Sequence, residues 1–371
     1  MERKKFRITK NSHVEVLPIK EIVWRKTFDG VCVLSGTLPG SGFTVFSRGI
    51  TIPEEIDGET VTELRGEYCA SEIEHIEAFG LKRISIKVVP DMFCSVMSCS
   101  IPDLYGCREK VESIDLEFCA KEMHVGVFSH SKVRNVTFVG KVLDDRDWEY
   151  GSFSDGIFQG CTSLKNVSGI WEGYHLGRGC FDGCISLVSI PILKVVQMGD
   201  RIFSDCKALP SIHLSNGLKR MGSYVFLNCV SLRDMYIPDT VESMGNGIFK
   251  GCTNLMTIHI PKSISAFGSE MFRDCKKLQK IFIPDALKRI GDYAFYGCEN
   301  LQSPWLPEGL TFIGKEAFFG CSSMNEIWIP QSVTSIGENA FAGCPRLLIK
   351  CLEGSIAAQY AKENNIPFRY V

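Results

Sequence analysis

Residues 252–274 read CTNLMTIHIPKSISAFGSEMFRD, and Cys275 starts the same pattern again. Nine cysteines mark successive copies of this unit. Every interval between them is 23 residues except Cys184 to Cys206, which is 22: Cys161, Cys184, Cys206, Cys229, Cys252, Cys275, Cys298, Cys321 and Cys344. A phenylalanine stands three positions before each of these cysteines. A fixed period of this length indicates one small structural unit repeated along an axis.

Each unit carries a short strand pattern followed by turn signals. In Leu255-x-x-Ile258-x-Ile260 the apolar residues alternate, which is typical of a strand with one buried face. Pro261 follows at once and should end the strand, because proline cannot donate to a ladder. A recurring glycine, here Gly268, indicates either positive φ or close backbone contact. The Phe-x-x-Cys step predicts about one helical turn with both side chains pointing inward.

A unit of this size cannot bury its own apolar face, so stacked copies, or rungs, must share a core. The period is too short for helical-repeat arrays of 33 residues or more and falls within the leucine-rich-repeat range of 20–29. We therefore expect an α/β solenoid, a right-handed superhelix of about twelve 22–23-residue repeats. Its parallel sheet would lie on the concave face, with short helical turns and strands elsewhere and a cap at both ends.

Residues 329–347 read IPQSVTSIGENAFAGCPRL. This run resembles the repeat I-P-x-x-[VL]-x-x-I-G-x-x-A-F-x-G-C-x-x-L of the BspA-like leucine-rich-repeat family. Residues 52–64 and 351–367 resemble the first repeat and the C-terminal end of the same family. The resemblance implies a bacterial, non-catalytic interaction protein that is often displayed on the cell surface, and it names no ligand.

Departures from the period divide the chain into four predicted segments. These are an N-terminal cap with a β-hairpin at residues 1–49, degenerate leucine-rich repeats with loop insertions at 50–157, regular 23-residue repeats at 158–346, and a C-terminal cap helix and strand at 347–371. Asp29-Gly30 is the hairpin signal. Extra length near residues 94–105 and 144–151 predicts loops. Ser355 suits the N-cap of a helix over residues 356–364.

The strand pattern also persists among the degenerate repeats. It reads Leu81-x-x-Ile84-x-Ile86 in the first clear copy. Similar runs begin at Val111 and Val133, after intervals of 30 and then 22 residues. These copies are expected to extend the same stack.

Composition and charge exclude several classes of protein. The chain has 41 basic and 43 acidic residues, so nothing favours nucleic-acid binding. No apolar run approaches the roughly 20 residues that span a bilayer, and no signal peptide follows the basic start. The chain as written predicts a cytoplasmic location, whereas the family resemblance implies a cell-surface or secreted one.

Catalytic motifs are absent from the sequence. It contains no Walker-type phosphate loop, no G-x-S-x-G elbow and no H-E-x-x-H helix. Regular repeats supply an extended surface instead of a cleft with converging reactive groups. We therefore expect no catalytic residues, no enzyme activity and no cofactor.

The 17 cysteines raise two alternatives to simple packing. The repeated cysteine is interpreted as a reduced, buried ladder, because free cysteine packs as a small hydrophobe. Neighbouring rungs lie about 4.8 Å apart, so disulfides between them remain an alternative. Zinc is the second alternative, with two candidate groups: Cys94 and Cys99 near Cys107, and Cys180 before Cys184. Neither group has the C-x₂-C pairs or partner histidines of a zinc site. We expect no metal site.

One column of the aligned repeats is aromatic. It is the residue between the two apolar strand positions, and from residue 213 onward it recurs every 23 residues: His213, Tyr236, His259, Phe282, Trp305 and Trp328. Strand alternation points this position away from the core. The position two residues earlier is small or charged and contributes Asp234, Lys280 and Glu326 to the candidate site. Exposed contiguous aromatic residues are typical of interfaces.

Three interpretations of this column stay open. A binding scaffold for a protein or peptide predicts that the charged neighbours matter as well. A glycan-binding module predicts that Trp305 and Trp328 dominate, because sugar faces stack on aromatic rings. A structural or self-associating repeat protein predicts a stacking ladder, since cross-strand aromatic pairs stabilise sheets. A protein or peptide partner is the leading prediction.

Overall fold

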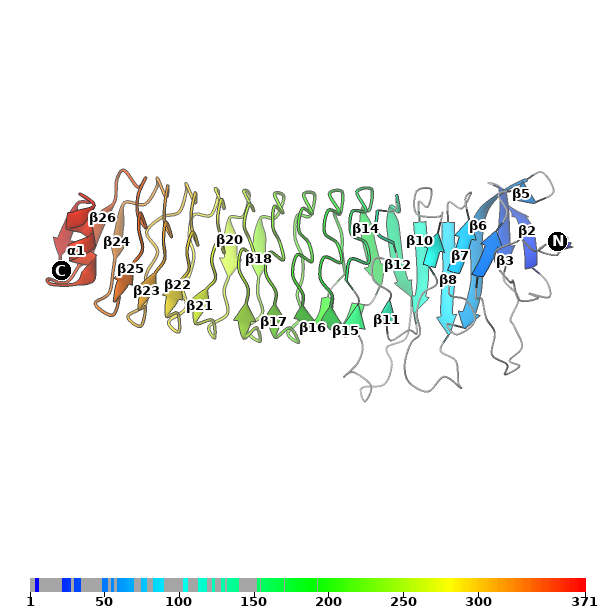
Figure 1. The fold of residues 1–371 in the computed structure, drawn as a ribbon, viewed down its shortest axis with the longest axis horizontal. Coiled ribbons are helices and arrows are strands. Elements are labelled where there is room, and N and C mark those ends of the chain that lie inside the picture. The colour runs from blue at the N-terminus through cyan, green and yellow to red at the C-terminus, as the bar shows by residue number, and fades with distance from the viewer. Residues whose placement is uncertain are drawn as a thin grey trace. The chain divides into compact units, whose positions relative to one another are not determined.

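The computed structural model describes residues 128–130, 132–139, 155–169, 171–191 and 193–371, and separate strands before them and at 152–153. Side chains are described for 128–130, 132–137, 155–169, 175–191 and 194–371. The chain divides into two compact units, residues 1–174 with 183–191 and residues 175–182 with 192–371. Figure 1 shows the strands of each.

The first unit is built around a mostly parallel sheet. Its strands are β1 (Lys4–Phe6), β2 (Ile22–Thr27), β3 (Gly30–Leu34), β5 (Glu55–Ile56), β6 (Glu59–Cys69), β8 (Arg83–Val89), β10 (Ser113–Phe118), β12 (Asn135–Val139) and β14 (Asn166–Gly169). They follow the order β1-β2-β3-β6-β8-β10-β12-β14, with β5 paired to β6. β2 and β3 pair antiparallel from Thr27 opposite Gly30, the arrangement expected for the hairpin at residues 29–30. From β3 to β14 the neighbours along this order are parallel.

Smaller strands complete this unit. A second sheet has the order β4 (Gly49–Ile52), β7 (His75–Ala78) and β9 (Asp103–Tyr105), and β11 (Glu122–Met123) pairs with β13 (Ser152–Phe153). β15 (Trp171–Leu176) contains residues of both units. In the predicted loop near 94–105 the structure describes β9, and the rest of that loop lies outside the described residues. The predicted loop near 144–151 lies wholly outside them.

The degenerate repeats stack in the register that their apolar pattern predicts. Ile114 lies opposite Ile84 on one side and Val136 on the other. Val136 in turn lies opposite Val167. Strands whose apolar residues face each other across the ladder keep one face of the sheet buried. The irregular intervals between these repeats therefore do not disturb the register of the strands.

The second unit is a parallel-sheet solenoid made of very short strands. One sheet joins β16 (Leu193–Met198), β17 (Arg220–Met221) and β19 (Ser243–Met244). Another sheet joins β18 (Asp234–Tyr236) and β20 (Thr257–His259), and a third joins β21 (Ala266–Phe267), β22 (Arg289–Ile290), β23 (Phe312–Ile313) and β25 (Ser335–Ile336). The last sheet joins β24 (Glu326–Trp328), β26 (Leu348–Cys351) and β27 (Phe368–Tyr370). Most paired residues are 23 apart, as Asp234 and Thr257 are.

The solenoid has about eight turns and little helix. The predicted count of about twelve repeats differs slightly from this.

The predicted helical turn at Phe-x-x-Cys is wrong. The Cys275 amide donates to the Phe272 carbonyl at 3.0 Å, which closes a four-residue turn. Between them Asp274 has a φ of 61°, and Glu270 just before has a φ of 60°. Both values lie in the left-handed region, which an α-helix cannot contain. The same two positions repeat along the stack and are often glycine, asparagine or aspartate.

The recurring glycine of each repeat, such as Gly291, is required because it lies close to the preceding rung, and not because its backbone has a positive φ. A Cβ added at Gly291 would lie 2.7 Å from the Ser269 nitrogen and 2.8 Å from the Gly268 carbonyl carbon. Gly245 would meet the rung before it in the same way. Glycine therefore sets how closely successive rungs approach.

The core of the second unit is a column of stacked rings, which we call the phenylalanine stack: Phe181, Phe203, Phe226, Phe249, Phe272, Phe295, Phe318 and Phe341. Adjacent ring centroids are 5.1–5.7 Å apart and the rings are within 16° of parallel. All eight side chains are buried. The stack follows from the 23-residue period, which places one inward phenylalanine on every rung.

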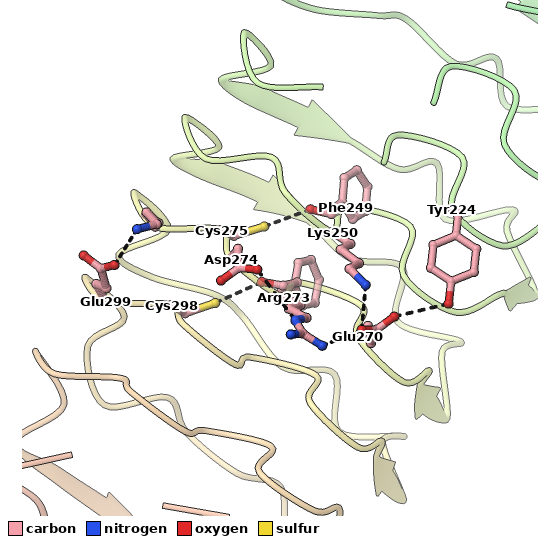
Figure 2. A network of polar contacts seen from close by, with 11 residues as sticks. Tyr224, Phe249, Lys250, Glu270, Arg273, Asp274, Cys275, Cys298 and Glu299 are labelled. Carbon is pink, nitrogen blue, oxygen red and sulfur yellow. Dashed lines mark hydrogen bonds and ion pairs between the residues drawn. The ribbon is translucent and has the colours of Figure 1, made fainter. Parts of the chain in front are cut away.

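The repeated cysteine is a hydrogen-bond donor as well as a packing residue. The Cys275 thiol donates to the Phe249 carbonyl, and the Cys298 thiol donates to the Phe272 carbonyl, both at 3.1 Å (Figure 2). The thiols of the other repeated cysteines between Cys229 and Cys344 make the same bond. Each donates to the carbonyl of the phenylalanine that lies 26 residues earlier in the chain. Each thiol thus satisfies a buried carbonyl of the preceding rung, which hydrophobic patterning alone did not reveal.

A helix covers the C-terminal end of the phenylalanine stack. α1 (Ile356–Glu363) begins after Ser355, whose side chain accepts a hydrogen bond from the Ala358 amide. Tyr360 meets the last ring, Phe341, edge to face at 6.0 Å, and its hydroxyl accepts a hydrogen bond from the Phe341 amide at 3.3 Å. Within the described residues, no helix is both long and apolar enough to span a bilayer.

Candidate functional site

Five of the six residues of the aromatic column lie between two buried neighbours in the second unit, and three of them lie on strands: Tyr236 on β18, His259 on β20 and Trp328 on β24. In β18 the middle residue, Met235, is buried while Asp234 and Tyr236 are exposed. Tyr236, Phe282 and Trp305 expose 55%, 69% and 65% of their surface. His213 is also exposed, and the remaining two, His259 and Trp328, are half-buried. The repeats therefore present a row of rings on the side away from the core.

This column is not a continuous stack like that of the core. Tyr236 and His259 stack with centroids 4.6 Å apart, and they are direct partners in the parallel ladder. Within residues 193–371, which are described throughout, this is the one ring stack between column members. Phe282 and Trp305 stand on neighbouring rungs without such contact. Ring stacking accounts for the first part of the column and leaves these two rings unexplained.

Carboxylates from the preceding rung hold two members of the column in place. The Asp239 carboxylate lies 3.2 Å from His259 Nε2, and Glu308 accepts a hydrogen bond from Trp328 Nε1 at 3.1 Å. These two acids each follow a strand-ending proline. His259 and Trp328 are also less exposed than Tyr236, Phe282 and Trp305.

The charged neighbours of the column differ in their partners. The Thr257 hydroxyl donates to the Asp234 carboxylate, across the β18–β20 pair. Glu326 forms an ion pair with Lys350 Nζ at 2.7 Å. Lys280 is exposed, and in the fully described segment 193–371 it forms no ion pair. Of Asp234, Lys280 and Glu326, Lys280 is therefore the residue whose charge is available to pair with an opposite charge on a partner.

A charge network that sequence reasoning missed lies among the turns. Glu270 accepts hydrogen bonds from Lys250 and Arg273 at 2.7 Å and from the Tyr224 hydroxyl at 3.2 Å (Figure 2). The Arg273 guanidinium lies 4.7 Å from the ring centroid of Tyr296, a cation–π contact. These residues come from four successive rungs, so no local motif could have revealed the network.

The electrostatics of this network favour the ionised form of its acid. Partial burial opposes ionisation of Glu270, but the hydrogen bonds from Lys250 and Arg273 outweigh it and lower the pKa of the Glu270 carboxyl. Burial, together with the Glu270 charge, raises the pKa of Tyr224. The acid is thus held as a charged acceptor for three donors, an arrangement that ties rungs together and leaves no reactive group exposed.

Most of the described cysteines are buried, and the exception is the half-buried Cys344. The free thiols from the middle of the solenoid to its end are Cys229, Cys252, Cys275, Cys298, Cys321, Cys344 and Cys351. Burial raises the pKa of the Cys275 thiol well above its ordinary value, which keeps it protonated and unreactive. In the part of the chain that the structure describes, no group of His, Cys, Asp and Glu could hold a metal ion. Cys94, Cys99 and Cys107 lie outside that part.

Among solved structures, the chain is similar to a leucine-rich repeat protein from Bacteroides ovatus, at 21% identity and a TM-score of 0.55. The match covers 94% of this chain and 98% of that one. The pneumococcal vaccine antigen PcpA is 15% identical, with a TM-score of 0.45 and coverage of 94% and 98%. A leucine-rich repeat protein from Eubacterium ventriosum is 17% identical, with a TM-score of 0.42 and coverage of 87% and 92%. The Bacteroides ovatus likeness supports the fold.

Sequence comparison identifies the family. The profile described as "BspA type Leucine rich repeat region" matches residues 149–255 and 221–348, in a form with six copies. Together these stretches cover more than half of the 371 residues. No curated protein sequence matches the chain. The predicted resemblance is confirmed: the chain belongs to the BspA-type leucine-rich-repeat family.

Proposed function

We propose that this protein is a non-catalytic scaffold that binds a protein or peptide partner through the aromatic column. The observation that carries the proposal is the exposure of Phe282 and Trp305, at 69% and 65%, on neighbouring rungs of a regular surface. Membership in a family of repeat proteins, which are generally without enzymatic activity, supports a binding role.

The energetics of exposed rings favour a partner. A phenyl or indole side chain buries on the order of 150–250 Å² when it is covered, and such residues dominate interface energies. Here each ring lies between two buried residues of the stack, so little backbone conformational entropy would be lost on binding. Covering Tyr236, Phe282 and Trp305 would therefore stabilise a complex.

Charges beside the column would orient the partner. Lys280 is exposed and lacks an ion pair in the fully described segment, whereas Asp234 and Glu326 already have partners within the chain. Charge complementarity acts mainly on specificity and association rate. A partner with an acidic group near its apolar patch fits this arrangement.

The test is capture of proteins and peptides from a defined library by the wild-type chain and by Tyr236→Ser/Phe282→Ser. We expect partners captured by the wild type to be lost by the double variant. The matched control is Ile185→Ser/Val188→Ser, which removes exposed apolar side chains outside the column and should bind like the wild type. Circular dichroism establishes that all three chains fold.

Two results would contradict the proposal. One is equal capture by the wild type and the double variant. The other is a change only in self-association, measured by sedimentation velocity, with no foreign partner for either chain. That second outcome would assign the column to assembly of copies of this chain.

A further inference from the structure

A polar groove of about 550 Å³ lies on the same unit, beside β24. Four of its lining side chains are amides: Gln279, Asn300, Gln302 and Asn325. Ser303 and Ser323 add hydroxyls, and Glu326 is the one charged member. A volume of this size is in the range of small-molecule sites, about 300–1,000 Å³.

The groove coincides with a break in the strands. Pro304 stands where other rungs have Met235, Ile258 or Ile327, and a proline has no amide to donate to a ladder. The β18–β20 sheet and the β24–β26–β27 sheet are separate, and residues 278–284 and 301–306 belong to no strand. The backbone in this region is therefore not committed to a sheet ladder.

The lining chemistry selects an uncharged ligand. Glu326 is neutralised by Lys350, whose Nζ lies 2.7 Å away. Within residues 193–371, described throughout, the side-chain amides of Gln279, Gln302 and Asn325 make no hydrogen bond inside the protein. Each amide offers donors and acceptors together, which matches hydroxyl groups and fits neither an apolar peptide anchor nor an anion.

Two tryptophans stand close in sequence to lining residues of the groove, although neither lines it. Trp305 and Trp328 follow Ser303 and Glu326 by two residues, about 7 Å along an extended chain and on the same side of it. Trp305 is 65% exposed. Pyranose rings carry apolar C–H faces as well as hydroxyls, so an exposed indole beside amides and hydroxyls presents complementary groups to both. Three rungs span about 10 Å, roughly the length of a disaccharide.

We infer that this groove binds an uncharged oligosaccharide, with the amides of Gln302 and Asn325 bonding its hydroxyls and Trp305 stacking on a sugar face. The inference goes beyond the proposed protein-binding function and shares one residue with it, Trp305. The groove itself is lined by no member of the aromatic column.

The experiment measures binding of cellobiose, chitobiose, maltose, mannobiose and lactose at millimolar concentration by saturation-transfer NMR and tryptophan fluorescence. We expect the wild type to bind at least one of them. Gln302→Leu/Asn325→Leu should bind it at least about tenfold more weakly, because polar partners are removed. Trp305→Ala should lose most of the fluorescence response.

Controls separate this site from the aromatic column. Arg233→Leu changes the same repeat position three rungs earlier, outside the groove, and should bind like the wild type. Tyr236→Ser/Phe282→Ser should also retain sugar binding even if it loses protein capture. Binding of none of the five disaccharides would overturn the inference, and so would wild-type affinity in Gln302→Leu/Asn325→Leu. Circular dichroism shows whether each variant is folded.

Discussion

The second unit carries two aromatic columns with the same 23-residue period, and they behave differently. In the phenylalanine stack every ring is buried and contacts the next at 5.1–5.7 Å. In the aromatic column the residue type changes from rung to rung, and one pair, Tyr236 with His259, stacks. Equal spacing along the axis therefore does not by itself produce a ring ladder.

The difference separates the roles of the two columns. The stack holds neighbouring rungs together, since a repeat array is stabilised mainly by its nearest-neighbour interfaces. The aromatic column adds little to those interfaces at Phe282 and Trp305. A surface that does not determine stability is free to carry recognition, which is the basis of the proposed function.

The largest expected effect comes from a matched pair of substitutions. Phe272→Ala removes a ring that stacks on both Phe249 and Phe295, and it should lower the free energy of unfolding by about 3–5 kcal/mol. Phe282→Ala, ten residues away on the aromatic column, should cost less than about 0.5 kcal/mol. Urea denaturation followed by circular dichroism measures both. A similar loss for Phe282→Ala would show that the two columns are equally structural.

A smaller effect is expected where the spacing of the stack is set. Gly291→Ala would place a methyl group within 2.7–2.9 Å of backbone atoms of the preceding rung, so the rungs must move apart. The expected loss is about 1–3 kcal/mol. Gly217→Ala is the control, because its added carbon would meet nothing closer than 3.6 Å. Equal unfolding midpoints for the two variants would contradict the close-contact role of Gly291.

The smallest effect should be pH-dependent and should arise in the charge network. Because the pKa of Glu270 is lowered in the folded chain, its contribution is present above the ordinary value of 4.5 and is lost as pH falls through the lowered value. Glu270→Gln should cost about 1 kcal/mol at neutral pH and progressively less in acid.

Thermal unfolding of the wild type and Glu270→Gln between neutral and acidic pH measures that difference. Glu299→Gln is the control, because its ion pair with Lys276 is half-exposed and such pairs contribute little. A constant difference between wild type and Glu270→Gln at all pH values would exclude ionisation of Glu270 as its cause.

Much of the fold was predictable because the pattern is periodic. Phe-x-x-Cys and the alternating strand residues identified the core, and Ser355 identified the start of α1. The turn conformation was not predictable from spacing, because a helical turn and a turn with two left-handed residues both place Phe272 and Cys275 inward. The residues of the aromatic column could be named from the repeat alignment, whereas their differing exposure depends on neighbours such as Asp239 and Glu308.

The sequence alone determined the period, the family, the inward phenylalanine and cysteine columns and the position of the outward aromatic residues. These are properties of spacing, and spacing is visible in one dimension. The tertiary structure decided which thiol meets which carbonyl, how Glu270 gathers donors from other rungs, and where polar side chains of three rungs line a groove. Those features depend on contacts between residues about 20 or more positions apart, which form only when the rungs stack.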